Sequence, residues 1–119
     1  MKIKEFAKFL ERDKRCYHCG KTDDTLVPQH RKNRGMGGSK LRDNPANIVV
    51  LCSYINGVIE SSSVWQDYAK KRGWKLESWQ EATRTPVYDS LSNKWFMLDN
   101  RYNRVALKEE KNADHSWRT

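Results

Sequence analysis

Cysteine, proline and long apolar runs are all scarce in this sequence of 119 residues. Its three cysteines are an odd number and two of them form a C-x-x-C pair, which argues against a disulfide framework and favours metal binding in a reducing compartment. No apolar run approaches the ~18 residues of a membrane span, and no signal peptide precedes the first charged residues. We therefore expect a cytoplasmic protein with no membrane partner.

Hydrophobic residues make up only 37% of the chain, so a single domain with a modest core is expected. A metal ion or a partner can add stability to a core of that size. The 23 lysines and arginines exceed the 15 aspartates and glutamates, which gives a formal net charge of +8. Such a charge favours a polyanion through counterion release, so we expect nucleic acid as the partner in preference to a merely soluble basic protein.

The hydrophobic spacing in the first two thirds of the chain predicts two helices and two strands. Apolar residues at helical spacing predict a helix over Met1–Asp13, and another helix is predicted to begin at Ser53 and to end at Gly73. Thr25–Gln29 and Asn47–Leu51 are strand candidates joined by a basic, glycine-rich loop. We expect these strands to pair as an antiparallel ribbon.

The last third of the chain reads as short strands separated by turns. The runs rich in aromatic or β-branched residues are Trp74–Ser78, Pro86–Tyr88, Lys94–Leu98 and Arg104–Leu107. They predict a small C-terminal β-hairpin or sheet. Residues 108–119 are charged and lack periodicity, which is typical of a disordered tail. The expected fold is therefore α+β, with one domain over residues 1–107 and its core at 15–72.

The cysteines predict a metal site that lacks one ligand. Cys16 and Cys19 form a tight knuckle in which two thiolates can face one zinc ion. Cys52 is a third thiol, but Ile55 stands where a second C-x-x-C pair would close. Either structural zinc is bound by these three cysteines and another ligand, or the metal has been lost and Ile55 packs against buried thiols. His18 lies between the first two cysteines, where knuckle geometry tends to point side chains away from the ion.

The residues that favour phosphodiester chemistry gather between Pro28 and Ser61. Hydrolysis requires water to lose a proton, and the imidazole of His30 is suited to accept one at neutral pH. A glycine-rich turn after it lets the backbone approach a ligand closely. The basic residues expected to hold the flanking phosphates are Arg31, Lys32, Arg34, Lys40 and Arg42.

Four segments, in this order and spacing, resemble the HNH endonuclease family. They are C-Y-H-C-G, Q-H-R-K-N-R-G-M-G-G, N-P-A-N-I-V-V-L-C and N-G-V-I-E-S, within a similarity that covers roughly Arg15 to Asn100. The chain is most similar to the small free-standing HNH proteins of bacteriophages. The resemblance implies the ββα-metal fold, in which two antiparallel strands and a helix surround one divalent cation. Members of the family often carry a zinc site of four cysteines beside it.

The resemblance also implies a role for each matching residue. His30 matches the general base, and Asn47 matches the asparagine that fixes the loop and so orients the histidine. Asn56 and Glu60 stand at positions that bind the cation, which is Mg²⁺, Mn²⁺ or Ni²⁺. Gln29 stands where most members have Asp or His as a metal ligand, so we expect it at the metal site with a neutral amide oxygen instead.

Two functions follow from the resemblance. The first is a metal-dependent endonuclease that cuts double-stranded DNA, encoded by a phage and acting as a homing-type nuclease or beside phage packaging proteins. The second is a catalytically weakened HNH fold that binds DNA or a host protein without cutting. Gln29 and Ile55, which depart from the family pattern, motivate the second function.

Overall fold

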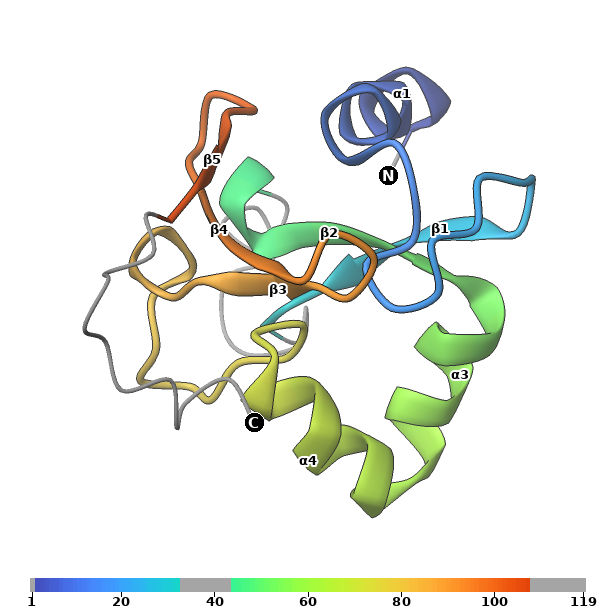
Figure 1. Ribbon diagram of the computed structural model, residues 1–119, viewed down its shortest axis with the longest axis vertical. Helices are drawn as coiled ribbons and strands as arrows, with labels where there is room; N and C mark the ends of the chain where they lie inside the picture. The colour runs from blue at the N-terminus through green and yellow to red at the C-terminus, as the bar shows by residue number, and fades with distance from the viewer. Residues whose placement is uncertain (1, 33–43, 108–119) are drawn as a thin grey trace.

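The computed structural model describes residues 2–32 and 44–107, and this part of the chain has an α+β fold. In chain order, its helices (α), 3₁₀ helices (η) and strands (β) are α1 (Ile3–Asp13), β1 (Leu26–His30), η1 (Pro45–Asn47), β2 (Ile48–Cys52), α3 (Ser53–Ser61), α4 (Ser63–Lys71), η2 (Ala82–Arg84), β3 (Val87–Asp89), β4 (Lys94–Leu98) and β5 (Arg104–Ala106). The strands form two antiparallel sheets, β1-β2 and β3-β4-β5 (Figure 1). None of the described helices has the length and apolar character needed to cross a membrane.

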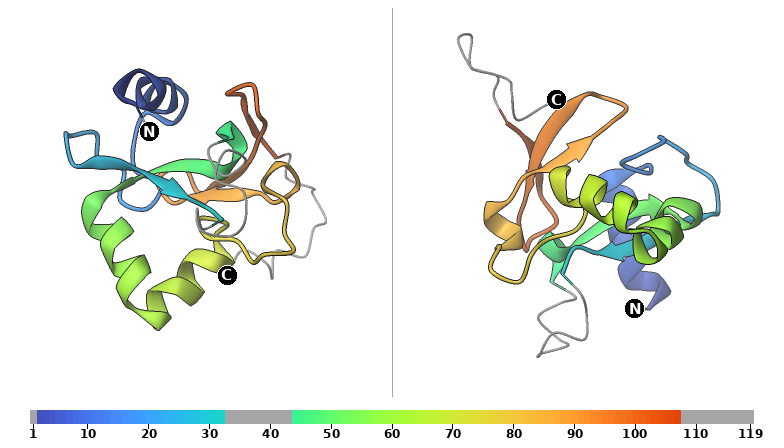
Figure 2. Two further views of the ribbon diagram at one scale, coloured as in Figure 1. Left: turned by 180° about the vertical axis from the view of Figure 1, so that it is seen from behind. Right: turned by 90° about the horizontal axis from the view of Figure 1, so that it is seen from below.

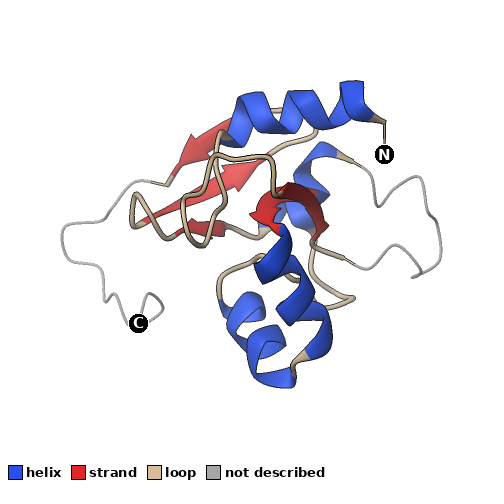
Figure 3. Ribbon diagram, turned by 90° about the vertical axis from the view of Figure 1, so that its right-hand side faces the viewer, coloured by secondary structure: helices blue, strands red, loops and turns tan. Residues whose placement is uncertain are grey.

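The predicted ribbon of two antiparallel strands is confirmed, with each strand beginning and ending one residue later than expected. His30 pairs with Ile48 at one end, and Leu26 pairs with Cys52 at the other. We call these the histidine end and the cysteine end of the ribbon. The strands lie between α1 on one side and the α3–α4 pair on the other (Figure 3). All five residues of β2 are buried, because this strand is covered from both sides.

The predicted N-terminal helix is present as α1. Fewer of its apolar residues are buried than its apolar stripe suggests. Phe9 is buried, whereas Ile3 is 90% exposed. The buried side of α1 also includes the carboxylate of Asp13. The helix ends because Lys14 adopts a left-handed conformation, with φ of 67°, and donates its backbone N–H to Leu10.

The single helix expected to begin at Ser53 is two helices, α3 and α4, which meet at a corner (Figures 1 and 2). The break falls at Ser62, whose backbone is extended, with φ of −128° and ψ of 124°. The Ser62 hydroxyl accepts a hydrogen bond of 3.4 Å from the backbone N–H of Trp65 and so caps α4. Ser62 is the middle of three consecutive serines, a residue type that favours caps and turns over helix interiors.

The predicted C-terminal sheet is confirmed and has three strands, but Trp74–Ser78 is not one of them. Trp74 is fully buried instead, and its indole N–H donates to the carbonyl of Tyr88 at 2.8 Å. Gly73 before it has φ of +76°, and a Cβ there would lie 2.1 Å from the carbonyl oxygen of Pro86. Only glycine allows this close approach of the segment after α4 to the segment before β3. The predicted tail at 108–119 lies outside the described residues.

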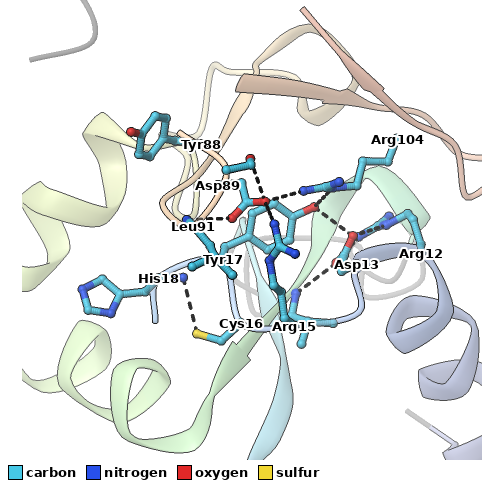
Figure 4. Close-up of polar contacts among 12 residues, drawn as sticks. Arg12, Asp13, Arg15, Cys16, Tyr17, His18, Tyr88, Asp89, Leu91 and Arg104 are labelled. Atoms are coloured by element: carbon cyan, nitrogen blue, oxygen red, sulfur yellow. Dashed lines mark hydrogen bonds and ion pairs between the residues drawn. The ribbon is translucent and has the colours of Figure 1, made fainter. Parts of the chain in front are cut away.

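A buried carboxylate joins α1 to the ribbon (Figure 4). Asp13 accepts two hydrogen bonds from the guanidinium of Arg12, at 2.7 and 2.8 Å. It also accepts the hydroxyl of Tyr17 at 2.8 Å and the backbone N–H of Val50 at 3.2 Å. Burial raises the pKa of Tyr17, with a further contribution from the Asp13 charge, so this hydroxyl stays protonated and donates.

A second buried carboxylate ties the C-terminal sheet to the same place. Asp89 accepts hydrogen bonds from Arg15 at 2.9 Å and from Arg104 at 2.8 Å (Figure 4). Arg104 also donates to the hydroxyl of Tyr17 at 3.1 Å. Together, Asp13 and Asp89 connect α1, the segment that carries the first two cysteines and the three-stranded sheet through paired charges. The hydrophobic pattern gave no indication of this network.

Candidate functional site

The side chain of Asn47 holds the backbone immediately after His30. Its amide oxygen accepts the backbone N–H of Lys32 at 2.9 Å, and its amide nitrogen donates to the Lys32 carbonyl at 3.3 Å. The Asn47 carbonyl also accepts the backbone N–H of Arg31 at 2.8 Å. Asn47 is 4% exposed, so water competes little for these bonds. This is the geometry expected of a residue that orients His30, and its part in catalysis stays a prediction.

Gln29 and Asn56 are hydrogen-bonded to each other. The Asn56 amide nitrogen donates to the Gln29 amide oxygen at 2.6 Å, which ties α3 to β1 beside His30. The Gln29 amide nitrogen donates in turn to the carbonyls of His30 at 3.1 Å and of Trp74 at 3.4 Å. These two carbonyls fix the direction of the Gln29 amide. The side-chain oxygen of Asn56 therefore takes no part in the hydrogen bond between Asn56 and Gln29.

This arrangement corrects the expectation that Gln29 would itself be a metal ligand. Gln29 is 1% exposed, and its single carbonyl oxygen points at Asn56. An ion at that oxygen would have to displace a short hydrogen bond in a buried position. In this structure Gln29 positions Asn56 and is not open to an ion.

Glu60 lies one helical turn after Asn56 on α3, as its spacing predicted. Its carboxylate is 54% exposed and lies 3.9 Å from the ammonium of Lys75. The sequence gave no sign of this contact, because Lys75 comes from the segment after α4. At that distance and exposure the pair is weak, so Glu60 stays accessible to a cation.

Arg31 does not lie where a phosphate could reach it, which corrects its predicted role. Its side chain is fully buried, with 0% exposure. Five backbone carbonyls surround the guanidinium at 2.6 to 3.5 Å, and they belong to Ala46, Gly73, Ala82, Thr85 and Pro86. Burial lowers the pKa of Arg31 to about 10, so the group keeps its charge at neutral pH. Arg31 therefore joins four segments of the fold, and its guanidinium is not exposed to a phosphate.

The remaining basic residues of the predicted phosphate-binding set fall into two groups. Lys32 is half-buried and donates its ammonium to the carbonyl of Ser78 at 3.1 Å, at the surface beside the histidine end. It can still meet a phosphate there, because an ammonium has three donors. The other three predicted contacts, at Arg34, Lys40 and Arg42, lie outside the described residues.

A small open cavity lies next to Asn47. Its volume is about 220 Å³, and it is lined by Lys32, Asn44, Asn47, Glu81, Ala82, Thr83 and Asn100. This is below the ~300–1,000 Å³ of sites for drug-sized ligands. The cavity therefore suits one small polar or planar group beside the histidine end.

The cysteine end brings together the three thiols that the sequence singled out. The sulfur atoms of Cys16, Cys19 and Cys52 all lie within 4.8 Å of one another, and those of Cys19 and Cys52 are 3.8 Å apart. Two thiolates bound tetrahedrally to one ion at a bond length of ~2.3 Å lie about 3.8 Å apart. The three cysteines are therefore close enough to bind a metal ion.

The knuckle that carries Cys16 and Cys19 is closed by main-chain hydrogen bonds. The backbone N–H of Gly20 donates to the Cys16 carbonyl at 3.0 Å, and Gly20 has φ of +75°. Burial raises the pKa of Cys16 to about 11. At Cys19 burial also acts to raise the pKa, but the backbone N–H of Lys21 and the neighbouring thiols outweigh it, and the pKa is lowered. Cys19 is exposed, so an ion can enter from its side.

Among the described residues, no fourth His, Cys, Asp or Glu joins the thiol cluster. Ile55 is 3% exposed and lies in the same hydrophobic core cluster as Cys16 and Cys52, which leaves both sequence-based alternatives open. The ring of His18 contacts the aromatic rings of Trp65, Tyr68 and Trp74 edge-on, at 5.5 to 6.0 Å between centroids. Burial lowers the pKa of His18, with a further contribution from Arg72, so it packs as a neutral aromatic ring.

The ribbon thus has a polar, amide-lined histidine end and a thiol-lined cysteine end. The structure places Asn47 and Asn56 in hydrogen bonds to the two neighbours of this strand end, Lys32 and Gln29, and the role of His30 stays a prediction. The sequence did not reveal Arg31 as a buried residue or Gln29 as a positioning residue. Both lie in a run whose neighbours in the sequence give no burial signal. Comparison of the chain with protein-family models, with curated proteins and with solved structures found no match.

Proposed function

We propose that the protein is a metal-dependent endonuclease that cuts double-stranded DNA in the manner of HNH enzymes, with β1, β2 and α3 as its ββα-metal core. The observation that carries this proposal is the Asn47 clamp on the backbone after His30. A general base must be held in one orientation relative to its substrate. A buried amide that binds the main-chain N–H and carbonyl of Lys32 fixes the backbone next to His30 in this way.

In this reaction His30 accepts the proton of the attacking water, and Asn47 keeps the histidine in line with the scissile phosphate. Lys32 binds a neighbouring phosphate oxygen and places the backbone of the DNA over the histidine end. The net charge of +8 accelerates the encounter with DNA and makes it sensitive to salt.

The divalent cation of such an enzyme would be held by the carbonyl oxygen of Asn56 and the carboxylate of Glu60. Oxygen donors of this kind are those that Mg²⁺ and Mn²⁺ prefer. When bound, the cation stabilises the charge that develops on the phosphoryl oxygens and on the departing 3′ oxygen. Gln29 supports this set by fixing Asn56. Because Glu60 is the one charged ligand of this set among the described residues, cation affinity depends strongly on it.

The three thiols at the cysteine end support a second, structural ion, which we propose to be zinc. Thiolates select soft or borderline ions, and the spacing of Cys19 and Cys52 suits the zinc–sulfur bond length. The side occupied in other zinc sites by a fourth cysteine is left to water or to another ligand. Such an ion would join the knuckle to the end of β2.

A second candidate function is DNA binding without cleavage, and one observation favours it. Among the described residues, the three cysteines are the only group of three or more His, Cys, Asp or Glu side chains placed to hold a metal ion. At the histidine end, the described groups that we propose for a cation are His30, Glu60 and the amide of Asn56, and Glu81 lines the cavity nearby. A cation there would rely on the DNA phosphate for part of its coordination.

Nicking of supercoiled plasmid separates the two functions. Wild type and His30→Ala are incubated with the plasmid in EDTA, Mg²⁺, Mn²⁺ and Ni²⁺. We expect metal-dependent nicking by the wild type and a loss of about 10²- to 10⁴-fold in His30→Ala, with DNA affinity within a few-fold because the base makes no phosphate contact. If no metal produces nicking above the level of His30→Ala, the endonuclease proposal is wrong, and DNA binding without cleavage becomes the better account.

A further inference from the structure

Trp79 differs from the other tryptophans that the structure describes. Its side chain is 76% exposed, whereas Trp74 is 0% and Trp95 is 8% exposed, and Trp65 is half-buried against the core. Exposing an indole to water costs free energy that burial would recover. An exposed indole is therefore available to stack on a ligand.

The turn that presents Trp79 is fixed at both ends. The backbone N–H of Gln80 donates to the Glu77 carbonyl at 3.1 Å, and the Gln80 side-chain oxygen accepts the backbone N–H of Glu77 at 2.8 Å. The Glu77 carboxylate pairs with Lys70 of α4 at 2.5 Å. Trp79 thus projects from a turn whose backbone is held in place, so little conformational entropy is lost when a ligand stacks on its ring.

This turn lies beside the histidine end. The backbone N–H of Leu76 donates to the Arg31 carbonyl at 2.7 Å, and the Lys32 ammonium donates to the Ser78 carbonyl at 3.1 Å. Figures 1 and 2 both show the segment after α4 running next to the end of β1. Trp79 is therefore one residue from a direct contact of Lys32, which follows His30 by two positions.

The small cavity described above is lined by the next residues of the same segment. Glu81, Ala82 and Thr83 line it together with Lys32 and Asn47. These residues include a carboxylate, a hydroxyl and an ammonium group, which can meet the polar edge of a planar ligand. An exposed aromatic ring, a lysine and a small cavity are the parts with which proteins hold single bases of a nucleic acid.

We propose that Trp79 stacks on an unpaired base of the DNA, so that the preferred substrate is DNA with single-stranded or distorted nucleotides next to the cleaved phosphate. This inference rests on the proposed function and names the substrate class of the same site. An intact duplex offers no base face to the indole, because its bases are stacked on one another. A bulge, a gap or a single strand offers one without the cost of unstacking.

The test measures binding in EDTA, where cleavage cannot interfere. Fluorescence anisotropy gives the affinity of the full chain for a labelled intact duplex, for the same duplex with a short unpaired bulge, and for the single strand. The variants are Trp79→Ala, Trp79→Phe and the control Tyr54→Ala. Tyr54 is also an exposed aromatic residue, at 68%, but it follows the cysteine end of the ribbon.

We expect Trp79→Ala to weaken binding to the bulged duplex and the single strand by about tenfold and to leave the intact duplex within about twofold. Trp79→Phe should keep most of the affinity, since it retains a ring, and Tyr54→Ala should behave as the wild type. Equal affinities of wild type and Trp79→Ala for the bulged duplex would overturn the inference and leave the indole to another partner, such as a protein.

The binding result and the nicking result can fail separately. If Trp79→Ala loses binding to the bulged duplex but the wild type shows no metal-dependent nicking, the stacking proposal stands and the endonuclease proposal is wrong. Nicking that depends on His30, together with unchanged binding by Trp79→Ala, would keep the endonuclease and remove the stacking site. The thermal midpoint of each variant is measured to show that the variant is folded. We expect Trp79→Ala to fold, because substitutions at exposed positions usually change stability little.

Discussion

The two ends of the β1–β2 ribbon hold their functional side chains in different ways. At the histidine end, Asn47, Gln29 and Arg31 are fixed by main-chain groups that are distant in the sequence, up to the Pro86 carbonyl. At the cysteine end, two of the three thiols come from one knuckle of the chain. A site built from distant contacts exists only when the domain has folded, whereas a local thiol pair can take up an ion early and stabilise the fold.

The largest effect on stability is expected at Arg31, which is the fully buried residue of the histidine end with five carbonyl partners. Arg31→Met removes the donors of five backbone carbonyls and should lower the free energy of unfolding by at least about 3 kcal/mol. Urea unfolding followed by circular dichroism measures this loss. Lys32→Met is the matched control and should change stability by less than about 1 kcal/mol, because Lys32 is half-buried with one such bond. Similar losses in both variants would mean that Arg31 is no more structural than its neighbour.

These two adjacent residues show where prediction from the sequence stops. Arg31 and Lys32 stand in the same basic run, and both were expected on phosphates. Their environments differ because Gly73, with no side chain, lets the segment after α4 close over Arg31, and no local pattern encodes that closure. The thiol cluster was predictable, since the C-x-x-C spacing fixes two ligands locally and Cys52 follows an apolar strand.

The break between α3 and α4 was likewise not predicted, although its cause is local. Hydrophobic residues continue at helical spacing through Ser62, so periodicity alone favours one helix. The three consecutive serines were the available signal, because serine competes for backbone hydrogen bonds at helix ends. The orienting role of Asn47 was predicted from the resemblance and stays a prediction, and the structure shows two hydrogen bonds from its side chain to the Lys32 backbone.

The next largest effect on stability is expected when zinc is removed from the cysteine end. Zinc at a concentration 100 times its dissociation constant should stabilise the wild type by about 2.7 kcal/mol over the EDTA-treated protein, and Mg²⁺ should not replace it because it prefers oxygen ligands. Thermal unfolding with and without zinc measures this gain. Cys52→Ser should remove the gain, whatever it does to the metal-free protein. A gain that persists in Cys52→Ser would place the zinc elsewhere.

Gln29→Glu tests whether the residue positions Asn56 from a buried place. The new carboxylate would face the carbonyls of His30 and Trp74 and should lower stability by about 2 kcal/mol at pH 8. Burial raises the folded pKa of such a carboxyl above its unfolded value of ~4.3, so the loss should grow as the pH rises and be smaller at pH 5. Gln66→Glu, on the half-buried side of α4, should show no such pH dependence. An equal pH response in both would argue that Gln29 is open to water.

The smallest effect on stability is expected at the clamp itself. Asn47→Ala removes two side-chain hydrogen bonds to Lys32 and should cost about 1–2 kcal/mol, measured by the same urea unfolding. Its nicking rate should fall further than this loss of stability explains, because His30 loses its fixed orientation. Asn44→Ala is the control, since the Asn44 side chain makes no capping bond to η1. Full nicking activity in a folded Asn47→Ala protein would remove the clamp from the mechanism.

The most direct test of the central claim, that chemistry lies at the histidine end and metal-dependent stability at the cysteine end, measures both properties in the same two variants. Nicking of supercoiled plasmid and the thermal shift with zinc are recorded for His30→Ala and for Cys52→Ser at a temperature where both are folded. We predict that His30→Ala keeps the zinc shift and loses nicking, while Cys52→Ser loses the zinc shift and keeps nicking. Nicking by His30→Ala at the wild-type rate, with none by folded Cys52→Ser, would contradict the account.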